Sequence, residues 1–149
     1  SGVAVAVRAG SPRPDLGSES AVRQAVLDAP SIGYSTGPSG VQLARLFERW
    51  GIATQIADRI VVPPPGVPVG ALVASGQVAL GFQQLSELMH LPGIEVLGPL
   101  PEPLQIVTIF AGGVATAAKQ PEAARTLLAF LASDATREIK RANGMDAAR

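Results

Sequence analysis

Short apolar runs typical of buried strands alternate with stretches of helical periodicity along this 149-residue chain. Runs of the first kind cover 2–9, 31–34, 61–62, 78–82, 94–97 and 104–111. Stretches of the second kind cover 18–29, 38–50, 52–60, 69–75, 86–90, 121–132 and 134–142. Strands that read as continuous apolar runs are covered on both faces, and alternation with helices is typical of βαβ units. The sequence therefore predicts an α/β fold, with a mainly parallel sheet flanked by helices.

The helix predicted from Pro121 to Ala132 has a strongly apolar inner face. The residues expected to point inward are Ala124, Leu127, Leu128, Phe130 and Leu131. Trp50, which ends the apolar stripe of the helix over 38–50, is likewise interpreted as a core residue rather than a ligand-stacking platform.

The stretch from Ser31 to Gly51 predicts a strand, a glycine-rich turn and an amphipathic helix. The first N–H groups of a helix lack partners within it, and the positive end of the helix dipole lies behind them. Such a helix start can hold an anion. Around this turn the candidate ligand-binding residues are Ser35, Thr36, Pro38, Ser39 and Gly40. The alternative is plain helix capping, because Gly, Ser and Pro gather at helix starts whether or not a ligand binds.

A second polar group follows the predicted strand over 78–82. Gln83 and Gln84 come directly after this strand, and ligands in open α/β sheets bind at the carboxyl ends of strands. These two residues are therefore candidate ligand contacts. The alternative is a solvated turn that leads into a helix beginning near Ser86 and Glu87.

Composition argues against several classes of function. Twelve basic and twelve acidic residues balance, which disfavours a nucleic-acid surface. Cysteine is missing and His90 is the single histidine, so no thiolate or multi-histidine metal site is expected. No nucleophile elbow, Walker sequence or dinucleotide fingerprint occurs, and His90 near Glu87 is better interpreted as a surface residue than as an acid/base pair. We therefore expect no catalytic residues, no cofactor and no enzymatic activity.

The order of several segments resembles that of a known family. The stretch Ser31 to Gly51, the run Gly70-Ala71-Leu72, the segment from Gly81 to Leu88, and the stretch Pro121 to Gly144 together resemble periplasmic solute-binding proteins of ABC importers, specifically the molybdate-binding type. Such proteins have two α/β lobes joined by two crossing strands. The resemblance implies that 1–8 is the first crossing strand, 9–103 the second lobe, and 104–149 the return strand with C-terminal helices of the first lobe, the rest of that lobe lying outside this sequence.

The resemblance also implies a ligand, a partner and a location. A small polar or anionic solute, such as the oxyanion molybdate, would contact backbone amides at Pro38 to Gly40 and near Val69. Two family contacts are altered here, because the expected tyrosine is Gln84 and Pro68 has no N–H to donate. The partner would be the membrane permease of an importer and the location periplasmic, although no signal peptide is found at the start of this sequence.

Two alternatives of other classes remain open. One is a cytoplasmic ligand-sensing regulatory domain of the same fold. The other is a small enzyme that acts on a phosphorylated or carboxylated substrate at the turn from Ser35 to Gly40, for which no base is found. We also expect self-association of this chain, because helices of the first lobe would expose the apolar face that they normally cover.

Overall fold

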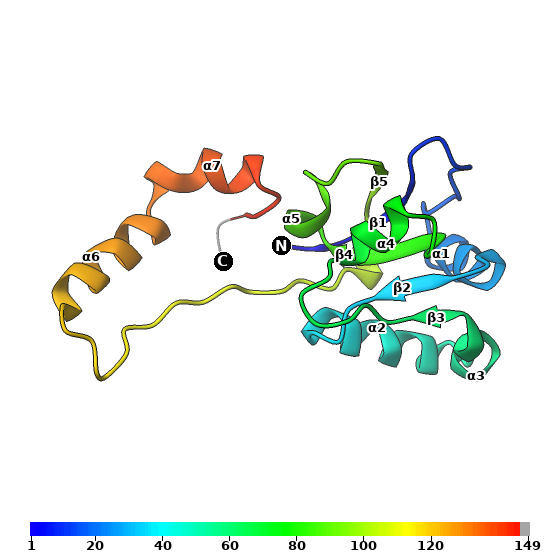
Figure 1. The fold of residues 1–149 in the computed structure, drawn as a ribbon, viewed down its shortest axis with the longest axis horizontal. Helices are drawn as coiled ribbons and strands as arrows, with labels where there is room; N and C mark the ends of the chain where they lie inside the picture. The colour runs from blue at the N-terminus through cyan, green and yellow to red at the C-terminus, as the bar shows by residue number, and fades with distance from the viewer. Residues whose placement is uncertain (147–149) are drawn as a thin grey trace.

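The computed structural model describes residues 1–146 and shows a sheet flanked by helices (Figure 1). Residues 107–146, an extended segment followed by helices, form an arm to one side of the sheet. Its strands are β1 (Val3–Arg8), β2 (Ile32–Tyr34), β3 (Ile60–Val61), β4 (Leu80–Gln84) and β5 (Ile94–Pro99). Its α-helices are α1 (Glu19–Asp28), α2 (Pro38–Arg49), α3 (Ala53–Ile56), α4 (Val69–Ala74), α5 (Leu85–Leu88), α6 (Pro121–Ala132) and α7 (Arg137–Ala142). Short 3₁₀ turns are η1 (Ala57–Arg59), η2 (Glu102–Leu104) and η3 (Asp134–Thr136).

The five strands form one sheet in the order β3-β2-β4-β1-β5. Strand β2 runs parallel to β3 and β4, whereas β1 runs antiparallel to β4 and β5. Four strands therefore share one direction, which confirms the predicted α/β fold with a mainly parallel sheet. The reversed β1 starts at the edge where the others end, since Val3 lies opposite Gln84.

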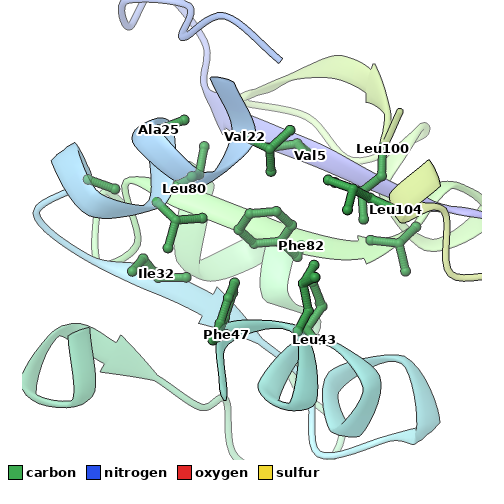
Figure 2. Close-up of a cluster of buried hydrophobic side chains, with 14 of the residues drawn as sticks. Val5, Val22, Ala25, Ile32, Leu43, Phe47, Leu80, Phe82, Leu100 and Leu104 are labelled. Atoms are coloured by element: carbon green, nitrogen blue, oxygen red, sulfur yellow. The ribbon is translucent and has the colours of Figure 1, made fainter. Parts of the chain in front are cut away.

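One face of the sheet carries the larger core. Along β1, Val3, Val5 and Val7 point to this face, because side chains alternate along a strand. Phe82 of β4 lies at its centre, between α1 and α2 (Figure 2). The Phe82 and Phe47 rings meet edge to face, with their centroids 6.3 Å apart. Strand alternation and the apolar stripe of α2 thus explain why these elements pack together.

The opposite face is built from small residues. Gly33 and Gly81 face helix α4, and a Cβ at Gly81 would come within 2.5 Å of the Val73 side chain. Ala4 and Ala6 of β1 pack here against Leu88. The absence of bulk on this face lets α4 lie close to the sheet, so Gln83 of β4 reaches Val69, the first residue of that helix.

The capping residues predicted from the sequence lie at the ends of the helices in the structure. The Ser18 hydroxyl accepts the amide of Ala21 at 3.1 Å as the N-cap of α1. Gly51 has φ +68° just after α2, as a C′ glycine should. Trp50 is half-buried against Phe47, and its indole N–H donates to Glu19 at 2.6 Å.

The strand predicted over 104–111 is wrong. Leu104 ends η2, and the segment makes a single bridge, between Gly2 and Val107. Beyond this bridge Ile109 and Phe110 are 72% and 57% exposed. An apolar run indicates that a segment is suited to burial, but a strand also needs a neighbouring strand to pair with, and the run does not show whether there is one.

The inward face predicted for α6 is not buried either. No residue of α6 is buried, and Leu127 and Phe130 are more than half exposed. Figure 1 shows the reason, because α6 lies in the arm at a distance from the sheet. The arm returns at its far end, where the Ser1 hydroxyl donates to the carbonyl of Gly144 at 2.7 Å.

Candidate functional site

The residues predicted to bind a ligand gather at one edge of the sheet. Tyr34 ends β2 opposite Phe82 of β4, so Ser35, the first residue after β2, lies beside Gln83, which is still within β4. This is the carboxyl edge of the parallel strands, where open α/β sheets bind ligands. The turn from Ser35 to Gly40 and the pair Gln83 and Gln84 therefore belong to the same region.

Helix α2 begins at this edge without a side-chain cap. Gly37 is its N-cap residue, and Pro38 occupies the first helical position. Ser39, the next residue, is only 2% exposed, and no hydrogen bond of its hydroxyl is found among residues 1–146. Because no side-chain N or O atom there is both wholly buried and without a partner, this hydroxyl keeps some contact with solvent. A solvent-accessible hydroxyl and uncapped amides at the positive end of a 12-residue helix can together hold an anion.

Gly40 has a steric role in this turn. A Cβ there would lie 1.6 Å from the carbonyl oxygen of Ser35, so the helix start rests directly on the preceding backbone. Thr36 and Pro38 are exposed, and Ser35 is half-buried. At this turn the predicted set thus contains one buried residue with a donor side chain, Ser39, and a glycine that shapes the turn around it.

Gln83 and Val69 are bonded to each other. The amide N–H of Val69, the first residue of α4, donates to Oε1 of Gln83 at 2.9 Å. Both residues are buried, Gln83 being 7% exposed. The Val69 amide could meet a ligand oxygen only after this bond breaks, so of this pair the free donor group is the NH₂ of Gln83.

Gln84 points to the other side of the sheet, because adjacent strand residues face opposite ways. Its Nε2 donates to the hydroxyl of Thr108 at 3.1 Å. Thr108 also exchanges two backbone bonds with Ser1, at 2.9 and 3.0 Å. The two glutamines therefore do different things, although their sequence positions are adjacent.

Thr108 and Tyr34 are site-edge residues that sequence reasoning missed. Thr108 lay within an apolar run, where its hydroxyl was the available signal. Tyr34 was interpreted only as the end of a strand, yet its ring is half-buried against Phe47, and burial raises the pKa of its hydroxyl. At neutral pH this phenol is protonated and is able to donate.

Charged side chains are missing from the candidate set. Glu87 and His90, the acid/base pair considered from the sequence, are both exposed. Within residues 1–146, no group of three His, Cys, Asp or Glu side chains is placed to hold a metal ion. No helix of that described part is long and apolar enough to cross a membrane.

The hollows of the surface lie elsewhere. One of about 410 Å³ is lined by residues that include Leu16, Pro101 and Gln105. A second of about 160 Å³ is lined by residues that include Gln42, Arg49 and Pro103. Neither hollow contains a candidate residue, whereas the uncapped helix start and the buried polar side chains lie together at the carboxyl edge of the sheet.

Comparison with known families settles the class of protein. The model of the family described as bacterial extracellular solute-binding protein matches residues 1–146. The chain belongs to this solute-binding family. A solved structure with the same fold is the substrate binding domain of a putative molybdenum ABC transporter from Clostridium difficile, with a TM-score of 0.68 and 17% identity. That match covers 99% of this solute-binding chain and 63% of the other, and at this identity it shows the fold alone.

A curated relative overturns the expectation that the protein is not an enzyme. Aconitate isomerase from Pseudomonas sp is 43% identical over 140 residues, which are 93% of this chain and 53% of the relative. The chain thus spans about half the length of that relative. The motifs sought in the sequence are those of hydrolases and transferases, and an isomerase belongs to neither class.

Proposed function

We propose that this chain binds a small polycarboxylate of the aconitate class at the carboxyl edge of its sheet, as part of a longer protein that isomerises it. The observation that carries this proposal is the 43% identity to aconitate isomerase over nearly the whole chain. Because the relative is longer than this chain, we assign the activity to the longer protein. This chain would supply one of its binding surfaces.

The donor set suits a carboxylate. Carboxylate oxygens accept hydrogen bonds, and the candidate edge offers the amides that begin α2, the Ser39 hydroxyl and the NH₂ of Gln83. The α2 dipole adds roughly half a positive charge at this end. Neutral donors of this kind can hold an anion and release it without separating an ion pair.

Isomerisation of an alkene tricarboxylate requires a proton to move. A base removes a proton from the methylene carbon beside the double bond, and the electron pair spreads through the alkene to a carboxylate. The proton is then added at the other end of this allylic system, the double bond shifts, and the other geometric isomer results without net oxidation or reduction. Donors fixed on the carboxylate stabilise that charge as it develops. We assign this role to Ser39 and Gln83, and the base to the part of the longer protein that faces them.

A second candidate function is delivery of a solute to an importer. It is supported by the family and by the fold shared with a transporter's substrate binding domain. In that case the protein is periplasmic, its partner is a membrane permease, and molybdate remains a candidate ligand. Residues 9–103 would form one lobe and 104–149 would pack on the other, with 1–8 as a crossing strand; without that lobe the exposed arm would promote self-association.

A ligand panel separates the two candidates. We expect calorimetric titration of this chain to show binding of cis- or trans-aconitate, and proton NMR of the longer protein to show their interconversion. Molybdate, tungstate and sulfate are the comparison ligands. Binding of molybdate with no response to either aconitate isomer would favour the importer and contradict the isomerase proposal.

A further inference from the structure

We infer that Gln83 is the specificity-determining donor of this site, with its amide locked so that it offers only N–H groups to the ligand. This inference rests on the proposed function and deepens it. It concerns which ligands the site can accept, namely those that present an acceptor oxygen at the end of β4.

The orientation of the Gln83 amide follows from chemistry. The group that faces it is the backbone N–H of Val69, which can only donate. The atom of Gln83 in this 2.9 Å contact must therefore be the oxygen, and Nε2 must lie on the other side of the amide. Because Val69 is 0% exposed and opens α4, turning the Gln83 amide over would leave the buried Val69 N–H without an acceptor, which is costly.

The NH₂ of Gln83 is left without a protein partner. Among residues 1–146, no hydrogen bond from Nε2 is found, and every side-chain N or O atom wholly removed from solvent has a partner. Nε2 therefore keeps contact with solvent, although the residue as a whole is only 7% exposed. A rigid, nearly buried amide with one open end is a preorganised donor, because the cost of ordering it is met during folding.

The residues around Gln83 make this donor selective. Gln83 lies beside the turn that begins at Ser35 and on the opposite side of β4 from Gln84, whose NH₂ is engaged by Thr108. Ligand groups that accept, such as carboxylates, are favoured at Nε2. Groups that only donate, such as ammonium ions, are disfavoured, since Nε2 has no lone pair to accept from them.

The test is the substitution Gln83→Glu. Glutamate keeps an oxygen for the Val69 amide but places a negative oxygen where the NH₂ was, so the fold should persist while anion binding is lost. Gln77→Glu is the matched control, because it makes the same change in an exposed residue before the opposite end of β4. Gln83→Leu removes the acceptor as well, and should lower the melting temperature.

We expect trans-aconitate to bind Gln83→Glu at least about 30-fold more weakly than the parent chain, with Gln77→Glu unchanged and both close to the parent in melting temperature. Equal binding by Gln83→Glu and the parent would overturn the role of Gln83 while leaving the proposed function intact. If the parent binds molybdate but no carboxylate, the proposed function fails, and loss of molybdate by Gln83→Glu would still support the donor. A parent chain that binds neither overturns both.

Discussion

Tyr34, the one tyrosine of the chain, lies half-buried, and this burial perturbs its ionisation. Burial raises its pKa above the ordinary value of 10.0, so the unfolded chain loses this proton first as the pH rises. The contribution of Tyr34 to the free energy of unfolding is constant below pH 10 and falls as the pH rises from there to the folded pKa. The slope is at most about 1.4 kcal/mol per pH unit.

We therefore expect Tyr34→Phe to lose less stability than the parent chain between pH 9 and pH 11. Urea unfolding of both chains at several pH values measures this difference, and absorbance of the tyrosinate gives the folded pKa directly. Parallel losses of stability in the two chains would contradict a perturbed Tyr34.

At the scale of elements, the junction between β2 and α2 depends on Gly40. A Cβ at this position would lie 1.6 Å from the Ser35 carbonyl, so Gly40→Ala must push the helix away from the turn. We expect the free energy of unfolding to fall by about 2 kcal/mol or more, together with weaker ligand binding. Gly37→Ala is the matched control, since its Cβ would meet only the Ser35 side chain, at 3.5 Å. Chemical unfolding of both variants checks this, and similar costs at the two positions would show that the close approach is not what fixes the turn.

The same junction shows what sequence can predict. Strand, turn and helix signals from Ser31 to Gly51 are local, and the structure has each of these elements in place. The bond between Gln83 and Val69 joins residues 14 positions apart, and it depends on how closely α4 lies to β4. The small residues Gly33 and Gly81 permit that approach, which no periodicity reveals. The candidate edge was therefore predictable as a region, whereas the partners within it were not.

At the scale of the molecule, the arm carries apolar side chains that nothing in residues 1–146 covers. Those more than half exposed include Val107, Ile109, Phe110, Leu127, Phe130 and Ile139. The hydrophobicity of these side chains indicates that they are suited to burial, but it does not identify the surface against which they pack. This is why the strand over 104–111 and the inner face of α6 were both wrong.

We expect this exposed face to make the chain self-associate as its concentration rises. Replacing Leu127 and Phe130 by glutamine should reduce association while changing the free energy of unfolding by less than about 0.5 kcal/mol each, because neither is buried. Phe82→Ala, in the centre of the core, should instead cost about 3–5 kcal/mol. Sedimentation velocity over a concentration series measures association, and a strictly monomeric parent chain at high concentration would contradict the expectation.

We propose that the carboxyl edge of the sheet binds a carboxylate through the start of α2. Calorimetric titration of the parent chain and of Ser39→Pro with trans-aconitate tests this proposal, because proline is tolerated in a first helical turn but removes one amide donor. We predict one site in the parent chain and binding at least about tenfold weaker in Ser39→Pro, with the melting temperature little changed. No heat of binding in the parent chain, or equal affinity in the two chains, would contradict the claim.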